Sequence, residues 1–380
     1  MKILIYTVYY PSPKQIDLPR NTEIVHYFAQ ECIKMGHDVR VVNMNFRFCS
    51  QLKSGMNYIF PKEGDYTYEG IPVHYFDVQS FIPKRWYTSR GQASWIDGRL
   101  KRFFHKLDWQ PDQVFIQFPT RFTGIEHPFS FSVPTLGIFH NTDRFCLQKD
   151  KGTIKRYVSR LNHYGYYNLL IKDEIKKDLG KDSIPAYAGI SSDLIAPQPL
   201  IEKKVSRQMD TMRILYAGQL IAQKNVDVLI RAVKKVSFPY ELEIIGDGEE
   251  AEALHQLAKN TNNIHFSGRL AREDVIQRMR QADVFVMVSH TETFGLVYLE
   301  AVAQGCLTVG SRGEGIDGIL IDGENGFLVK PGNVEETAQV LETIYALRPE
   351  DRAAIINKGY QLALDTTNTK MVQREIQVNQ

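Results

Sequence analysis

The alternation of strand-like and helix-like segments is the feature that most constrains the fold of this chain. After residue 212, five short apolar runs alternate with helix-like segments, and four of the five end in glycine: RILYAG, ELEIIG, NIHFSG, DVFVMV and CLTVG. The same alternation opens the chain, where KILIYTVYY is followed by a helix-like segment and then by DVRVVN. Three further runs, DQVFIQF, PTLGIFH and YYNLLI, indicate more strands in this first part. Because strand–helix–strand units build parallel sheets, the pattern predicts an α/β protein with two doubly wound domains.

A segment without sustained periodicity separates the two series of strands. Residues 194–212 contain two prolines and a cluster of charged side chains, a composition typical of a linker. A chain of 380 residues also suits two domains better than one hydrophobic core. We therefore predict an N-terminal domain over 1–195, a linker over 196–212, a C-terminal domain over 213–364, and a tail over 365–380 that can cross back to the first domain.

The composition excludes several classes of protein. The four cysteines form no C-x-x-C pair, which argues against a structural zinc site and against a disulfide framework. No apolar run approaches the roughly 18 residues of a membrane-spanning helix, and the N-terminus lacks the pattern of a signal peptide. These observations favour a cytoplasmic protein. The formal net charge is only +2, and we expect no nucleic-acid partner.

Polar residues that follow the predicted strands are the candidates for a binding site, because ligands of doubly wound folds bind outside the carboxyl ends of the strands. Gly218 begins the loop after RILYAG, and Lys224 lies where the next helix should start. A helix N-terminus with a nearby lysine can cradle a phosphate, although a solvated lysine would give the same pattern. Arg269 follows NIHFSG, and Gly295 would let the backbone approach a ligand closely.

Two glutamates flank the Thr-Phe-Gly turn at 293–295, and their spacing limits what they can do. Glu292 precedes the turn and could cap a helix, whereas Glu300 lies among apolar neighbours in LVYLEAVA and should have a partner. On a helix, eight residues span about 12 Å. Paired glycosidase carboxylates stand roughly 5–9.5 Å apart, so hydrolysis is disfavoured. The spacing suits two ends of one elongated ligand, with a sugar at one glutamate, a nucleoside ribose at the other, and a diphosphate at Lys224.

Two other cofactor patterns can be weighed from the sequence. GDGEEA, at 246–251, matches the dinucleotide fingerprint G-x-G-x-x-G/A after a strand. However, Asp247, Glu249 and Glu250 would set carboxylates against a pyrophosphate, which disfavours a nicotinamide cofactor. No D-x-D pair occurs in the chain, so we expect neither a metal-chelated diphosphate nor any other bound cofactor.

Several of these motifs together resemble a known family. GQL, QKN, IIGDGE, FSGRL, ADVFVMVSHTETFGLVYLEAVAQG and GENGFLV are similar to the donor domain of the family 4 retaining glycosyltransferases. The resemblance is strong over about 213–345 and fainter in the first domain, where GHDVRVVN, FHNTD and AGISSDLIAPQP carry it. It implies the GT-B fold, in which two Rossmann-like domains face a cleft. The variant GSRGEGIDGIL resembles bacterial enzymes of teichuronic acid, capsule and exopolysaccharide synthesis.

The resemblance implies roles for the matching residues. Those implied to be catalytic are His140, Lys224 and Glu292. Those implied to bind the donor are Gly218, Gln219, Lys224, Arg269, Leu270, Glu292, Thr293, Phe294, Gly295, Leu296 and Glu300, with Glu292 and the 293–295 backbone on the sugar, Glu300 on the ribose, Lys224 on the diphosphate, and Arg269 and Leu270 near the base. Those implied on the acceptor side are Asn21, His140 and Asp143. The chain departs from the family at Gln219, where arginine is usual, and in having no glycine between residues 9 and 35.

The implied activity is transfer of a sugar from a UDP- or GDP-sugar to a glycan or lipid-linked acceptor in cell-surface polysaccharide synthesis. The family implies retention of anomeric configuration, without a metal. Three alternatives remain open: a sugar-nucleotide epimerase of the same fold, a non-catalytic sugar-nucleotide-binding paralogue, and an NAD-dependent oxidoreductase.

A basic segment in the first domain indicates a possible membrane contact. IDGRLKRFFHKL, at 96–107, has an apolar stripe, and its polar residues from Arg99 to Lys106 are all basic or histidine. The tryptophans Trp86, Trp95 and Trp109 flank it, and residues 1–200 carry 26 Lys and Arg against 19 Asp and Glu. These features are typical of an interfacial helix on the inner face of an anionic membrane. A core helix with a charged outer face would show the same pattern.

Overall fold

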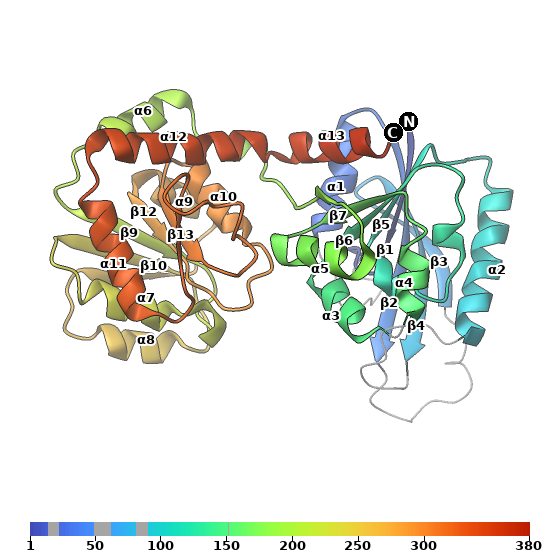
Figure 1. Cartoon of the computed structure of the whole chain (residues 1–380), viewed down its shortest axis with the longest axis horizontal. Helices are drawn as coiled ribbons and strands as arrows, with labels where there is room; N and C mark the ends of the chain where they lie inside the picture. Colours follow the sequence, from blue (N-terminus) through green and yellow to red (C-terminus); the bar gives the residue numbers. More distant parts are fainter. Residues whose placement is uncertain (14–22, 49–61, 81–89, 151) are drawn as a thin grey trace. The chain divides into compact units, whose positions relative to one another are not determined.

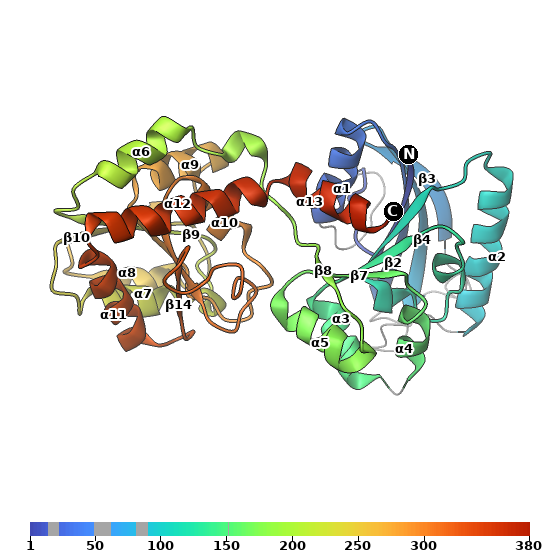
Figure 2. The same cartoon turned by 45° about the horizontal axis from the view of Figure 1, so that its top comes forward.

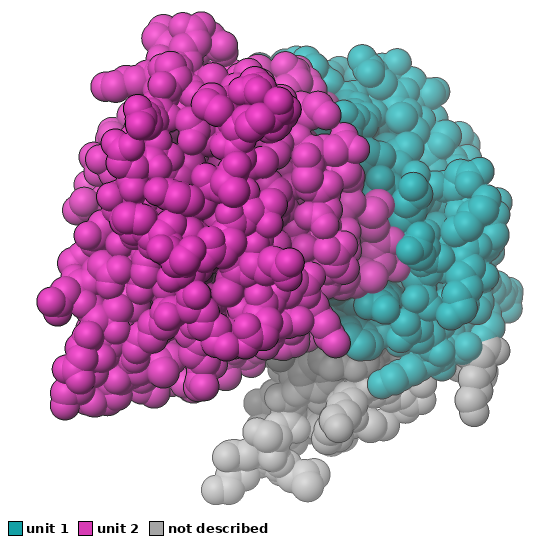
Figure 3. Space-filling view, turned by 60° about the vertical axis from the view of Figure 1, so that its left-hand side comes forward, with its two compact units in different colours: residues 1–167, 171–188, 371–380 teal, residues 168–170, 189–370 magenta. Residues whose placement is uncertain are grey.

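The computed structural model describes residues 1–13, 23–48, 62–80, 90–150 and 152–380. The chain forms two compact units, which Figure 3 distinguishes by colour. Unit 1 comprises Met1–Tyr167, Ile171–Ala188 and Met371–Gln380, and unit 2 comprises Asn168–Leu170 and Gly189–Lys370.

Unit 1 is built on an eight-stranded sheet in the order β3-β4-β2-β1-β5-β6-β7-β8. Its strands are β1 (Lys2–Thr7), β2 (Asp38–Phe48), β3 (Lys62–Tyr68), β4 (Ile71–Ser80), β5 (Gln113–Gln117), β6 (Thr135–Phe139), β7 (His163–Tyr166) and β8 (Ile184–Pro185). The pairs are parallel except for β3, which runs antiparallel to β4. Every residue of β5 and β6 is buried, as expected for parallel strands covered on both faces.

The helices of unit 1 are α1 (Glu23–Lys34), α2 (Arg90–Lys106), α3 (Asn141–Lys149), α4 (Thr153–Val158), most of α5 (Leu169–Leu179) and most of α13 (Asn368–Val378), with the short 3₁₀ turns η2 (Pro119–Phe122) and η3 (His127–Phe129). The strand predicted for YYNLLI is wrong, because β7 ends at Tyr166 and LLI begins α5. A short apolar run fits a buried strand and a buried helix turn equally well. Figure 1 and Figure 2 both show α13 beside α1.

Unit 2 is built on a six-stranded parallel sheet in the order β11-β10-β9-β12-β13-β14. Its strands are β9 (Met212–Ala217), β10 (Tyr240–Ile245), β11 (Ile264–Gly268), β12 (Val284–Val286), β13 (Leu307–Ser311) and β14 (Phe327–Val329). Its helices are α6 (Gln198–Ser206), α7 (Val226–Val233), α8 (Ala251–Ala258), α9 (Arg272–Gln281), α10 (Leu296–Ala303), α11 (Val334–Tyr345) and α12 (Pro349–Asp365), with the 3₁₀ turns η4 (Ser192–Leu194) and η5 (Ala222–Lys224). In Figure 1, α7 and α8 cover one face of the sheet and α9 and α10 the other.

The segment predicted as a linker, 196–212, belongs to unit 2 and contains α6. Both of its prolines lie at the start of this helix, where proline costs nothing because the first helical N–H groups have no partner. Ile201 is buried, and Lys204 Nζ donates to the carbonyl oxygens of Met279 (2.8 Å) and Ala282 (2.7 Å). The chain instead passes between the units after Tyr167, Leu170, Ala188 and Lys370.

The basic helix α2 packs its apolar stripe into unit 1. Ile96, Leu100 and Phe104 are buried, and the ring of Phe103 stacks on His74 at 4.0 Å. Trp109 is buried as well, whereas Trp86 lies outside the described residues. The alternative of a core helix with a charged outer face therefore holds, and the apolar stripe cannot insert into a bilayer. The exposed basic and histidine side chains among the described ones of α2 are Lys101, Arg102, His105 and Lys106. No helix within the described ranges is long and apolar enough to cross a membrane.

Candidate functional site

Lys224 and Glu292 form an ion pair at the point where the strand order of unit 2 reverses. Lys224 ends η5, in the connection after β9, and Glu292 lies in the connection after β12, the strand next to β9. The Nζ–Oε2 distance is 2.5 Å, and the two side chains are 21% and 13% exposed. A reversal of strand order beside the carboxyl ends of parallel strands is where doubly wound folds bind ligands. The structure thus brings together the two residues that the sequence analysis placed on a diphosphate and a sugar.

Hydrogen bonds hold these two loops against each other. Asn225, in the left-handed conformation (φ 51°), donates from Nδ2 to the carbonyl oxygen of Val288 at 2.7 Å. The backbone N–H of His290 donates to the carbonyl oxygen of Gln223, also at 2.7 Å. Since Asn225 is buried, the first bond lies in the protein interior, where a lost partner is costly. Lys224 and Glu292 are therefore carried by one connected backbone framework.

The turn before α10 requires glycine at Gly295. Its φ of 77° is in the left-handed region, and an added Cβ would lie 2.6 Å from the Tyr298 ring. Phe294 is buried, Thr293 is exposed and Leu296 begins α10. The first turn of α10 therefore begins three residues after Thr293, and the leading N–H groups of an α-helix have no partner within the helix. Such a helix N-terminus favours an anion.

Two buried tyrosines hold the carbonyl oxygens of the same loops. Tyr216 donates from its hydroxyl to the carbonyl oxygen of Gln219 at 2.8 Å, and Tyr298 donates to that of Met287 at 2.6 Å. Burial raises the pKa of both phenols, and the carboxylate of Glu292 raises it further. Both hydroxyls therefore remain protonated donors. The Gln219 side chain is exposed, and only its backbone takes part in this framework.

Glu300 has the partner that its apolar surroundings require. Its residue surface is 9% exposed, and Oε1 accepts from Nη2 of Arg272, at the start of α9. Sequence reasoning did not find Arg272. The available signal was the charge itself, because a carboxylate in an apolar helix needs a cation or strong donors. Arg269 is exposed and Leu270 is half-buried, just after β11.

The glycines of GDGEEA allow neighbouring loops to pack backbone against backbone. A Cβ on Gly246 would lie 1.8 Å from the Gly218 oxygen, and one on Gly248 would lie 2.3 Å from the Leu220 oxygen. Leu220 N–H also donates to the Asp247 oxygen at 2.9 Å. These close approaches account for both glycines without a dinucleotide. Gly218 is thereby fixed as part of the framework beside the Lys224 loop.

His140 is buried in unit 1, between two aromatic rings. It follows β6 and precedes α3. Its ring stacks on that of Phe118, with the centroids 3.9 Å apart, and on that of Tyr167, with the centroids 4.7 Å apart. Its Nε2 lies 2.7 Å from Oε1 of Gln117. Burial lowers the pKa of His140 to about 3. The imidazole is therefore neutral at physiological pH and suits hydrogen bonding or positioning rather than proton uptake.

Asp143 ties two segments of unit 1 together. Its carboxylate accepts from the backbone N–H of Thr120 (3.0 Å), the hydroxyl of Thr120 (2.5 Å) and the backbone N–H of His140 (2.8 Å). Burial raises its pKa to about 6, although these bonds lower it in part. His140 and Asp143 belong to unit 1, whereas the other described candidates belong to unit 2. Asn21 lies outside the described residues.

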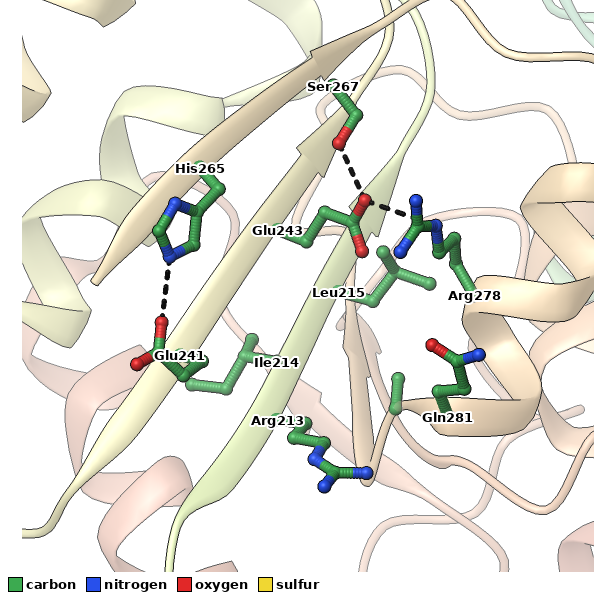
Figure 4. Close-up of a pocket in the computed structure, with 10 residues that line it drawn as sticks. Arg213, Ile214, Leu215, Glu241, Glu243, His265, Ser267, Arg278 and Gln281 are labelled. Atoms are coloured by element: carbon green, nitrogen blue, oxygen red, sulfur yellow. Dashed lines mark hydrogen bonds and ion pairs between the residues drawn. The ribbon is translucent and has the colours of Figure 1, made fainter. Parts of the chain in front are cut away.

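A pocket of about 430 Å³ lies elsewhere in unit 2, against the strands β9, β10 and β11 and helix α9 (Figure 4). Several of its polar side chains bind one another: Glu243 accepts from Ser267 at 2.6 Å and lies 3.5 Å from Arg278, and Glu241 lies 2.8 Å from His265. None of the residues predicted from the sequence lines it. Among the described residues, no group of three or more His, Cys, Asp and Glu side chains is arranged to hold a metal ion. Metal independence itself stays a prediction.

Residues 197–362, which include every described candidate of unit 2, match the family model for "Glycosyl transferases group 1". The match covers somewhat less than half of the chain and shows that this region is similar to group 1 glycosyltransferase domains. Its curated relatives include a lipopolysaccharide core biosynthesis glycosyltransferase, LpsE of Rhizobium meliloti, which is 36% identical over 38% of this chain and 42% of that protein. A glycogen synthase of Mycobacterium tuberculosis is 25% identical over 90% of this chain and 86% of its own length. An uncharacterised glycosyltransferase of Methanocaldococcus jannaschii is 26% identical, and the match spans 63% of its length.

Solved structures that superpose on the whole of this chain have the same fold. HepE of Anabaena, solved in complex with UDP, superposes with a TM-score of 0.67 at 18% identity, over 100% of this chain and 99% of that one. A glycosyltransferase of Rickettsia africae superposes with a TM-score of 0.65 at 14% identity, over 99% and 97% of the two chains. The predicted fold class is confirmed: the chain has the GT-B fold, with two Rossmann-like bodies.

Proposed function

We propose that this protein transfers a sugar from a nucleotide-diphosphate sugar to a glycan or lipid-linked acceptor in cell-surface polysaccharide synthesis. One observation carries the proposal: the Lys224–Glu292 ion pair lies where the strand order of unit 2 reverses, directly before the N-terminus of α10. A cation, a carboxylate and the N-terminus of a helix together suit a diphosphate joined to a sugar.

The proposed mechanism rests on charge and position. Lys224 stabilises the departing diphosphate, because the negative charge on that group grows in the transition state. Glu292 accepts hydrogen bonds from donor-sugar hydroxyls and exchanges part of its contact with Lys224 for them. Glu300 binds the ribose hydroxyls while it keeps Arg272 as its counterion. Neutral His140 orients a reactant by hydrogen bonding, since a pKa of about 3 makes it a poor base.

The finer parts of the proposal have separate support. UDP is the first nucleotide to test, because HepE was solved with UDP and the chains share their fold. A cell-surface glycan acceptor is supported by the named role of LpsE in lipopolysaccharide core synthesis. Retention of anomeric configuration rests on the resemblance to family 4, and metal independence rests on the absence of a D-x-D pair. Lys101, Arg102 and Lys106 of α2 are exposed cations that would attract the protein to an anionic inner leaflet.

The test is a transfer assay with UDP- and GDP-sugars and a set of glycan and lipid-linked acceptors, measured with and without excess EDTA. We expect acceptor-dependent release of nucleoside diphosphate that EDTA does not abolish. Isomerisation of the donor without an acceptor would identify an epimerase instead. Nucleotide-sugar binding without turnover on any acceptor would identify a non-catalytic paralogue. Loss of activity in EDTA that manganese restores would overturn the metal-free mechanism alone.

A further inference from the structure

The segment 312–318 of unit 2 packs directly on the loop that carries Glu292. The carboxylate Oε2 of Glu314 accepts from the backbone N–H of Glu292 at 2.9 Å, and the N–H of Gly315 donates to the Glu292 carbonyl oxygen at 3.0 Å. Both backbone polar groups of Glu292 are therefore held by two consecutive residues. A Cβ on Gly315 would lie 2.1 Å from the Thr293 oxygen, so only glycine allows this contact.

The Glu292 loop needs such support because its backbone is strained. Thr291, just before Glu292, has a φ of 55°, which is uncommon for a β-branched residue. Thr293 follows Glu292, and its carbonyl oxygen accepts from Nδ2 of Asn168 at 2.9 Å. Glu314, Gly315 and Asn168 together fix the backbone from 292 to 293, and with it the direction in which the Glu292 carboxylate leaves the chain.

Glu314 also changes the charge of this part of the site. Within the described chain, no cation forms an ion pair with Glu314, and Arg312 of the same segment pairs with Asp322 (3.0 Å) and Glu336 (3.8 Å). Both Glu292 and Glu314 act on the same buried phenol, because each raises the pKa of Tyr298 in addition to the larger effect of burial. Among the described side chains, Lys224 pairs with Glu292 alone, so the Glu314 carboxylate, bonded to the Glu292 backbone, adds a second negative charge next to the proposed position of the donor sugar.

We infer that Glu314 is a specificity-determining residue of the donor-sugar site: its carboxylate positions Glu292 and adds a second negative charge that disfavours a donor whose sugar is a uronic acid. This inference rests on the proposed function. A neutral hexose offers hydroxyl donors to the two carboxylates. A uronate offers a third carboxylate instead, and like charges held close together repel.

The test compares UDP-glucose with UDP-glucuronic acid, which differ by one carboxylate, by calorimetric titration of the whole protein. We expect wild type to bind UDP-glucose about tenfold more tightly than UDP-glucuronic acid. Glu314→Gln keeps an oxygen acceptor for the Glu292 N–H but removes the charge, so this ratio should fall roughly fivefold while UDP-glucose affinity holds. Glu314→Ala also removes the acceptor and should weaken UDP-glucose more than free UDP. Free UDP serves as the folding control in each variant.

The matched control is Asp317→Asn. Asp317 lies in the same segment and carries the same charge, but its carboxylate accepts from the Gly313 N–H at 2.6 Å rather than from Glu292. Asp317→Asn should therefore leave the ratio of the affinities for UDP-glucose and UDP-glucuronic acid unchanged. The same comparison with GDP-mannose and GDP-mannuronic acid applies if the protein binds GDP rather than UDP. Equal binding of neutral and uronate donors, or an unchanged ratio in Glu314→Gln, would overturn this inference and leave the proposed function standing. Binding of none of these nucleotides would overturn the proposed function itself.

Discussion

The carboxylate of Glu300 is buried on α10 and ion-paired with Arg272, whose side chain is 52% exposed at the start of α9. The asymmetry of this pair matters for any test of Glu300. The guanidinium reaches water, so it stays solvated when the carboxylate is removed. The carboxylate has no such alternative and depends on its partner or on a ligand.

Glu300→Ala should weaken nucleotide binding with little loss of stability. Removing a charged acceptor from a ribose hydroxyl pair costs roughly 1.5–3 kcal/mol of binding free energy. Loss of this ion pair costs about 1 kcal/mol or less of stability, because its cation, Arg272, is half exposed and stays hydrated, and the buried charge is removed with the carboxylate. Calorimetric titration with UDP measures the first effect, and thermal unfolding measures the second. The control is Asp274→Ala, which removes an exposed carboxylate from α9, the helix that carries Arg272. This variant should bind UDP normally. An unchanged UDP affinity in Glu300→Ala would show that the ribose assignment is wrong.

Lys224→Ala should reduce turnover more than it weakens donor binding, because its charge stabilises a diphosphate that becomes more negative in the transition state. The substitution also leaves Glu292, 13% exposed, without its cation. The double variant Lys224→Ala/Glu292→Gln separates these effects, since it removes the unpaired charge as well. We expect a coupling energy of about 0.5–3 kcal/mol between the two sites in the kcat of the single and double variants. A change in KM alone would mean that Lys224 only binds the donor.

His140 should make unit 1 less stable as the pH falls. Its pKa is lowered to about 3 by burial, so between pH 6.5 and 3 the unfolded chain binds a proton that the folded chain does not. Stability from this group is therefore lost on acidification, by up to about 1.4 kcal/mol per pH unit. Asp143 acts in the opposite direction: burial raises its pKa to about 6, so its contribution is present below about pH 4 and is lost as the pH rises through 6.

His140→Phe isolates the histidine effect, because phenylalanine can keep the stacking between Phe118 and Tyr167. Unfolding followed by tryptophan fluorescence reports unit 1, since all three tryptophans lie within its sequence range. The stability of wild type relative to the variant should increase by about 2 kcal/mol from pH 4.5 to pH 6.5. The same difference at both pH values would show that His140 titrates normally in the folded state.

The sequence predicted the strand ends well and the side-chain partners poorly. Lys224 and Glu292 could be placed in one site because each follows a strand, and parallel strands share one carboxyl edge. Arg272 could not be assigned to Glu300, since their contact depends on how α9 packs beside α10. Local pattern also failed where one short run fits two structures. The run LLI after β7 forms the first turn of α5, although its apolar character equally suits a strand.

The exposed cations of α2 should bind anionic membranes through charge alone. Lys101, Arg102 and Lys106 face solvent, whereas Ile96, Leu100 and Phe104 are buried in unit 1 and cannot insert. Each cation near an anionic surface contributes about 1 kcal/mol, and this attraction is screened by salt. We therefore expect sedimentation with phosphatidylserine-containing liposomes at low ionic strength, release at high salt, and little binding to neutral liposomes.

The variant for this test changes Lys101, Arg102 and Lys106 to glutamate and keeps Arg99, because Arg99 binds Glu63 within unit 1. Its control changes the exposed side chains Lys172, Lys176 and Lys177 of α5 to glutamate, which alters the net charge by the same amount on another helix. If net charge alone governed liposome binding, both variants would lose that binding equally. If the face of α2 is the contact surface, only the first variant fails to sediment. Equal sedimentation of wild type and both variants would remove the case for a membrane contact and favour a soluble acceptor.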